Sequence, residues 1–122
     1  MDRLLLAIAA GFGFTGVALG AFGAHALKSR LTVEALATYQ TGVLYHLVHA
    51  VILAVVAVIA SRGSSTLLTA AGWSFAGGIV LFSGSLYVLS VTGIRGFGAI
   101  TPIGGLLFLA GWLCLMIAAI RS

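Results

Sequence analysis

Long apolar stretches separated by short polar segments dominate the pattern of residues along the chain. Four of them have the length of a membrane span: residues 4–27, about 42–60, about 67–91 and about 103–120. A helix needs roughly 20 mainly apolar residues to cross a bilayer. The stretches lack the alternation of a transmembrane β-strand. Because backbone groups in lipid must be hydrogen-bonded internally, the pattern predicts four transmembrane helices.

Small residues recur at helical spacing within these stretches. They form three lines, one in each of the first, third and fourth segments: Gly13, Gly16, Gly20 and Gly23; Ser74, Gly77 and Gly84; Thr101, Gly104 and Gly111. In lipid, a face of small residues lets two helices approach closely. We therefore predict a single all-α domain over residues 1–122, an integral membrane four-helix bundle tightly packed through glycine-rich faces.

Composition and charge agree with this prediction. The chain is 61% hydrophobic and 7% charged, whereas a soluble domain has about 25% charged residues. Its formal charge of +4 comes from scattered bases, and without a basic run we expect no nucleic-acid partner. Four spans would leave both termini on one side. The orientation stays open, because the positive-inside rule needs a bias and each side holds three bases: Arg3, Arg62 and Arg121 on one, Lys28, Arg30 and Arg95 on the other.

Two helix starts can be recognised from the sequence. Thr32 is suited to cap the second helix, and Glu34 in its first turn favours the helix dipole. Thr101 followed by Pro102 is typical of an N-cap followed by proline at the first helical position. Both starts lie on the side of the membrane where the first and third helices end.

Polar residues inside a membrane are costly and often functional, and here the topology gathers them. The first and third helices end where the second and fourth begin, so one half of the bilayer would contain all of the following: His25, Tyr45, His46, His49, Ser83, Ser85, Tyr87 and Thr101. The opposite half would hold Trp73, Trp112 and Cys114 among aliphatic residues. We interpret the polar group as a half-cavity that binds a membrane lipid, a small ligand or a partner subunit.

The histidines are the chemically richest part of this group. His46 and His49 are three residues apart and can share a ligand on one helix face. With a third ligand they could bind a transition metal or haem, an alternative that we leave open. The energetic cost of an unpaired polar group in hydrocarbon predicts that His49 faces the interior and bonds Ser83, Ser85 or Thr101. His46 should matter less. At the same rim, Arg30 and Arg95 could contact a lipid headgroup.

Other functions have weaker support in the sequence. A small homo-oligomeric transporter or channel would need a polar lane through both halves of the membrane, and polarity in one half favours binding instead. No pair of carboxylates is placed for hydrolysis, so we expect neither an enzyme nor a bound cofactor. The expected partners are membrane lipid and either a second copy of the chain or another membrane protein.

Several motifs are similar to those of a known family. They are Gly20-Ala21-Phe22-Gly23-Ala24-His25, Thr41-Gly42 with Tyr45 and His49, Leu81-Phe82-Ser83-Gly84-Ser85-Leu86-Tyr87, and Thr101-Pro102-Ile103-Gly104-Gly105 with Gly111-Trp112. Over nearly its whole length, the chain resembles the domain-of-unknown-function 423 family, which includes YgdD-like bacterial proteins and an animal relative called transmembrane protein 256. The resemblance implies a multi-pass protein of the bacterial inner membrane. It implies no activity, and His46 matches its pattern less clearly than His25 and His49.

Overall fold

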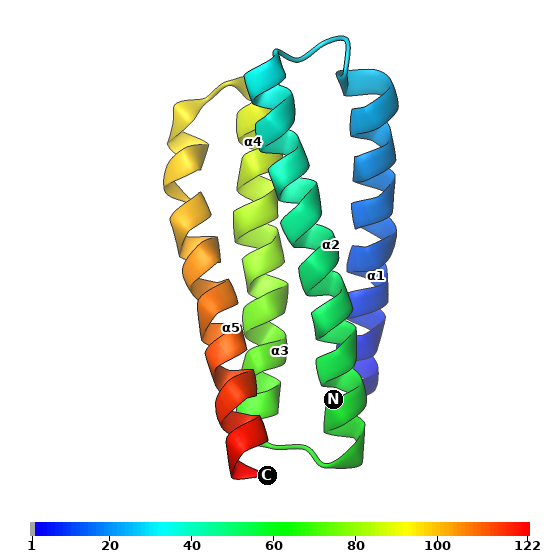
Figure 1. Ribbon diagram of the computed structural model, residues 1–122, viewed down its shortest axis with the longest axis vertical. Coiled ribbons are helices and arrows are strands. Elements are labelled where there is room, and N and C mark those ends of the chain that lie inside the picture. The colour runs from blue at the N-terminus through cyan, green and yellow to red at the C-terminus, as the bar shows by residue number, and fades with distance from the viewer. Residues whose placement is uncertain (1) are drawn as a thin grey trace.

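Four long helical rods run antiparallel in the computed structural model, which describes residues 2–122 (Figure 1). The first two rods are α1 (Asp2–Phe22), which a π-helical turn extends over Gly23–Leu27, and α2 (Val33–Arg62). The third rod joins α3 (Thr66–Gly78) to α4 (Gly84–Thr92) through a π-helical turn (Ile79–Ser83). The fourth is α5 (Thr101–Arg121), which follows a short 3-10 helix (Arg95–Ala99).

Within the described residues, four helical segments are long and apolar enough to cross a membrane. Each of the four predicted stretches lies inside one of these rods. The predicted all-α membrane fold is confirmed. Both ends of the described chain lie at the same end of the molecule, as four spans require (Figure 1).

The helix ends follow from local chemistry, with one exception. The Thr32 hydroxyl caps α2 by accepting the Ala35 N–H at 3.1 Å, as predicted. Gly93 ends α4 with a φ of +72°, a left-handed conformation that glycine adopts without steric cost. The prediction that Thr101 caps α5 was wrong. Ile100 holds the cap position, and the Thr101 hydroxyl bonds Ser85 on α4 instead, at 2.6 Å.

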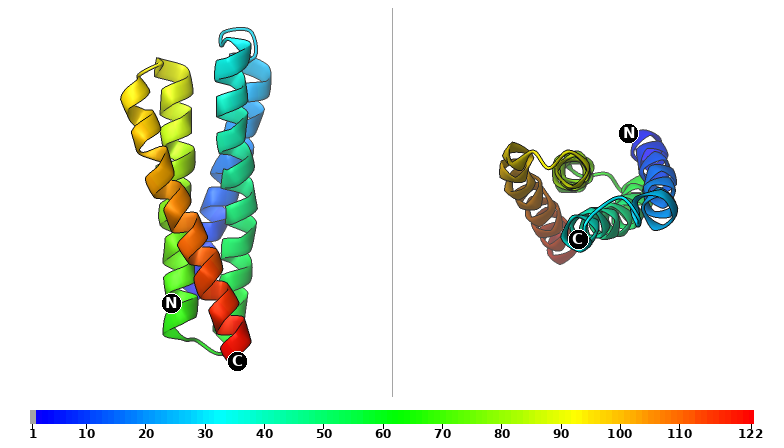
Figure 2. Two further views of the ribbon diagram at one scale, coloured as in Figure 1. Left: turned by 60° about the vertical axis from the view of Figure 1, so that its left-hand side comes forward. Right: turned by 90° about the horizontal axis from the view of Figure 1, so that it is seen from above.

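The rods are arranged as two pairs. Seen from above in Figure 2, α2 and the α3–α4 rod lie between the outer helices α1 and α5. The outer helix α1 packs mainly on α2, and α5 packs mainly on α3 and the π-helical turn. The pairs meet where α2 contacts the α3–α4 rod. Each outer helix therefore leaves most of its surface to the bilayer.

Glycines mark the close approaches within both pairs. On α1, a Cβ at Gly16 or Gly20 would crowd Leu47 or Val43 of α2, and one at Gly23, in the π-helical turn that follows, would overlap the Tyr39 ring. On α5, a Cβ at Gly104 would overlap the backbone of Phe82. The predicted glycine-rich packing faces are therefore present.

Not every glycine in the predicted lines lies at such a contact. Gly13 and Gly84 have open space where a Cβ would be. Two closely packed glycines, Gly72 against Leu5 and Gly78 against Phe108, lie outside the predicted lines. Spacing alone therefore located the faces but not every member of them.

Candidate functional site

His46 on α2 connects three helices. Its side chain is 4% exposed. The ring Nδ1 lies 2.8 Å from the Tyr87 hydroxyl of α4, and Nε2 lies 3.2 Å from the Thr15 hydroxyl of α1. Thr15 donates its one hydroxyl proton to the Phe12 carbonyl. The network therefore assigns the ring proton to Nε2, which donates to Thr15, while Nδ1 accepts from Tyr87.

His49, one turn further along α2, makes a different set of contacts. The Trp112 indole N–H of α5 donates to Nε2 at 3.1 Å, and Nδ1 lies 2.8 Å from the Tyr45 carbonyl. Since an indole can only donate, Nε2 carries no proton and Nδ1–H donates to the carbonyl. The ring stacks on Phe108 with centroids 3.7 Å apart. His49 is thus neutral and tied to α5.

The orientation predicted for His49 is confirmed, but its predicted partners were wrong. The ring is buried and bonds the fourth transmembrane helix. Its partner is Trp112, which the sequence interpretation assigned to the opposite half of the membrane. The long indole side chain of Trp112 reaches His49 from α5. The shorter hydroxyl side chains of Ser83, Ser85 and Thr101 bond other partners.

The shorter hydroxyl side chains also join helices. Ser83, fully buried in the π-helical turn, donates to the Gly42 carbonyl of α2 at 2.7 Å. Ser85 donates to the Phe82 carbonyl at 2.8 Å, so its oxygen accepts the Thr101 proton. These bonds link the α3–α4 rod to α2 and to α5.

Three predicted site residues lie apart from this network. His25 is exposed on the π-helical turn after α1, away from His46 and His49. Arg30 and Arg95 are exposed near the ends of their helical rods. His25 therefore takes no part in the hydrogen bonds of His46 and His49.

In the region of the predicted polar half-cavity, the buried polar side chains are hydrogen-bonded. Among the residues that the structure describes, no buried side-chain nitrogen or oxygen lacks a hydrogen-bond partner. Tyr45, which is 40% exposed, packs its ring against Phe82 with centroids 4.7 Å apart. An apolar hollow of about 190 Å³ lies beside it, lined by Leu44, Tyr45, Val48 and His49.

A metal centre finds no support in this arrangement. Within residues 2–122, no group of three or more His, Cys, Asp or Glu side chains is placed to hold a metal ion. His46 and His49 direct their rings to different helices. Because all four of their ring nitrogens are engaged in hydrogen bonds, neither histidine offers a free ligand.

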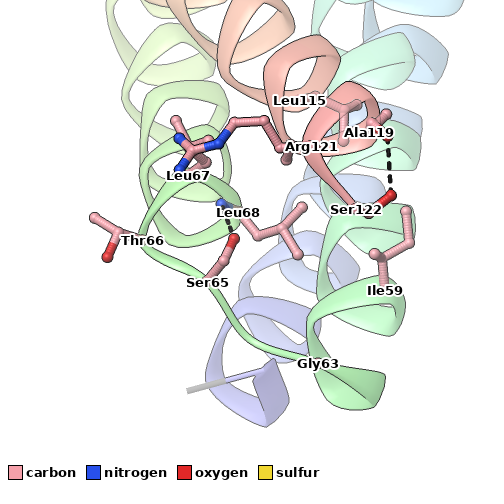
Figure 3. A pocket seen from close by; sticks show the side chains of 11 residues that line it. Ile59, Gly63, Ser65, Thr66, Leu67, Leu68, Leu115, Ala119, Arg121 and Ser122 are labelled. Carbon is pink, nitrogen blue, oxygen red and sulfur yellow. Dashed lines mark hydrogen bonds between the residues drawn. The ribbon is translucent and has the colours of Figure 1, made fainter.

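A larger pocket lies at the opposite end of the molecule, next to the chain ends (Figure 3). It has a volume of about 650 Å³ and lies where α2 ends, α3 begins and α5 ends. Its lining is mostly apolar and consists of Ile59, Gly63, Ser65, Thr66, Leu67, Leu68, Leu115, Ala118, Ala119, Arg121 and Ser122. We call it the terminal pocket.

The sequence interpretation missed the terminal pocket for a simple reason. Ala118, Leu68 and Ile59 are ordinary residues of apolar helices, and nothing in their spacing distinguishes a wall from a packed face. Arg121 was interpreted only as a basic residue at a helix end. In Figure 3 its side chain extends from α5 towards Leu67 in the first turn of α3. The pocket combines residues of α2, α3 and α5, which the spacing within any one helix does not reveal.

Comparison with known proteins identifies the family. The model of the family described as "Protein of unknown function (DUF423)" matches residues 19–105. The chain belongs to the DUF423 family. The UPF0382 membrane protein YwdK of Bacillus subtilis is 50% identical over 86% of both chains. The UPF0382 inner membrane protein YgdD of Escherichia coli is 41% identical over 98% of this chain and 92% of its own length.

This DUF423 member is accordingly a multi-pass bacterial membrane protein, and the name of its Escherichia coli relative YgdD specifies the inner membrane. The family description gives no biochemical role. No solved structure matches the chain.

Proposed function

We propose that this DUF423 protein is a non-catalytic membrane protein that binds a membrane lipid in the terminal pocket. The sequence alone favoured a ligand in the opposite, polar half. The polar groups in that half are hydrogen-bonded to one another. The open pocket near the chain termini is therefore the better ligand site.

The terminal pocket is the observation that carries this proposal. Its volume of about 650 Å³ is within the range of roughly 300–1,000 Å³ that is usual for small-ligand sites. Ile59, Leu68 and Leu115 contribute apolar walls from three different helices. A site with such walls favours a hydrocarbon chain over a hydrated solute.

The membrane setting narrows the ligand further. Each of the three helices around the pocket belongs to a segment long and apolar enough to span a bilayer. The pocket lies at their ends, where acyl chains meet headgroups. A phospholipid presents both an apolar body and a polar head at this depth, which matches apolar walls with a polar rim of Ser65, Thr66 and Arg121.

A non-catalytic role is supported by the state of the polar side chains. General acid–base catalysis needs a titratable group within reach of a substrate. His46 and His49 are 4% exposed and hydrogen-bonded on both ring nitrogens. The chain contains two acidic residues in all, which leaves few groups that could exchange protons with a ligand.

Native mass spectrometry of the purified protein tests the proposal. Wild-type protein, released gently from detergent micelles containing phospholipid, should retain lipid. Ala118→Trp should lose most of it, because the indole would fill the pocket. Ala110→Trp is the matched control, since Ala110 is exposed on the same helix and does not line the pocket.

A second filling variant guards against misfolding. The second variant is Ala119→Trp. Ala119 also lines the pocket, and its exposed position easily accommodates a large side chain. If both filling variants unfold at the wild-type temperature and retain as much lipid as Ala110→Trp, the proposal is wrong.

A further inference from the structure

Basic residues surround the end of the molecule that holds the terminal pocket. Arg62 ends α2 and Arg121 ends α5, and Arg3 lies in the first turn of α1. Of the two acidic residues in the chain, Glu34 lies in the first turn of α2, at the opposite end. Asp2, next to Arg3, is the other. Three arginines against one aspartate give this end a positive balance.

We infer that the lipid in the terminal pocket is an anionic phospholipid whose phosphate contacts Arg121. This inference rests on the proposed function and adds the class of headgroup. Arg121 is the basic residue that lines the pocket itself, in the last turn of α5. Figure 3 shows its side chain extending along the pocket towards the first turn of α3.

The first turn of α3, towards which Arg121 extends, complements a phosphate. Ser65 caps α3, with its hydroxyl accepting the Leu68 N–H at 3.1 Å and its carbonyl accepting the Thr69 N–H at 3.0 Å. The preceding amides of this first turn have no partner within the helix, and the positive end of the helix dipole favours an anion. This contribution has the same sign as the charge of Arg121, whose side chain extends towards the same turn.

The walls distinguish a lipid phosphate from a free one. Below the rim, Ile59, Leu68 and Leu115 enclose apolar space that a hydrated inorganic anion cannot fill. Arginine side chains at helix ends commonly extend to the level of the headgroups. Arg121 lines a pocket whose other walls are apolar. A phospholipid could therefore contact the guanidinium with its phosphate and the walls with its acyl chains.

Lipid retention from mixed nanodiscs tests the inference. The nanodiscs would contain equal amounts of phosphatidylglycerol and phosphatidylcholine with identical acyl chains. Wild-type protein should retain phosphatidylglycerol about 5-fold more than phosphatidylcholine, the preference expected from one arginine close to an anionic lipid. Arg121→Gln should lower this ratio to near one while total retained lipid persists.

Arg95→Gln is the matched control, because Arg95 is exposed at the other end of the molecule and lies outside the pocket. It should keep the wild-type ratio. An equal loss of preference in Arg95→Gln and Arg121→Gln would indicate general surface charge and overturn the inference. So would release of phosphatidylglycerol by inorganic phosphate alone, which would identify a free-anion site.

The outcomes separate this inference from the proposed function. Equal retention of both lipids by wild-type protein, with less in Ala118→Trp, would overturn the headgroup class and leave lipid binding supported. Retention of neither lipid above the level of Ala118→Trp would overturn both.

Discussion

At the residue scale, two histidines one turn apart on α2 carry their ring protons on different nitrogens. His46 holds its proton on Nε2 and accepts from Tyr87, whereas His49 holds its proton on Nδ1 and accepts from Trp112. The sequence suggested that they could share one ligand. Their rings instead diverge, and each ties a different part of the bundle to α2.

The His49–Trp112 bond should show a measurable coupling. His49→Phe keeps the stacking on Phe108 and removes the acceptor, and Trp112→Phe removes the donor. A double-mutant cycle on the free energy of unfolding, measured by denaturant titration in mixed micelles, should give a coupling of roughly 0.6 kcal/mol and at most about 1.7 kcal/mol. Strictly additive effects would mean that the bond contributes nothing.

His46→Leu should destabilise the bundle at least as much as His49→Leu. The sequence favoured the reverse order, but His46 bonds side chains of both α1 and α4, whereas His49 bonds a side chain of one other helix. Losing two interhelical bonds of roughly 0.6 kcal/mol each should cost about 1 kcal/mol or more. The same micelle titration checks the order, and a smaller loss in His46→Leu would contradict it.

At the element scale, single glycine positions decide how closely the helices pack. Gly104 and Gly105 are neighbours on α5 and face different environments. A Cβ at Gly104 would overlap the Phe82 backbone in the π-helical turn, whereas one at Gly105 would lie 3.8 Å from the Phe82 ring, an ordinary contact. Backbone cannot move aside as the end of a side chain can. The same added methyl group should therefore be disruptive at position 104 and tolerated at position 105.

Gly104→Ala should therefore be destabilising and Gly105→Ala should not. We expect a loss of about 1–3 kcal/mol for the first, the usual cost of overpacking. The second should be neutral or should gain up to about 1 kcal/mol from higher helix propensity. Thermal unfolding of the two variants in detergent measures the difference. Equal melting temperatures would show that α5 can move away from the π-helical turn without loss of stability.

At the scale of the whole molecule, the described chain has two chemically different ends. One end, with two of the three connections between rods, holds Lys28, Arg30, Glu34 and Arg95, and the end with the termini holds the terminal pocket. Basic residues are balanced between the two ends, so charge does not impose an orientation. The proposed lipid site therefore lies at the end opposite to Lys28, Arg30, Glu34 and Arg95.

Cysteine labelling in intact cells tests this topology. In a Cys114→Ala background, Ser29→Cys lies in the turn between α1 and α2, and Ser64→Cys lies in the turn between α2 and α3. A membrane-impermeant reagent should label one position from outside and the other only after permeabilisation, because α2 separates them. Labelling of both from the same side would contradict the four-span arrangement.

The sequence by itself determined the class of the protein, the number of rods, the cap at Thr32 and the faces on which Gly16, Gly20 and Gly104 pack. These properties depend on local composition and on helical spacing, both of which can be read directly from the order of residues. The motifs at Gly20–His25 and Leu81–Tyr87 also determined its family.

Only the tertiary structure decided the partners of the polar groups and the location of open space. Trp112 bonds His49 from a helix, α5, that packs closely on the third rod where Gly104 meets Phe82 and Gly111 meets Phe75. The terminal pocket is lined by residues of α2, α3 and α5 together. Each of these depends on the relative placement of helices that are distant in sequence, which the periodicity of any one helix does not contain.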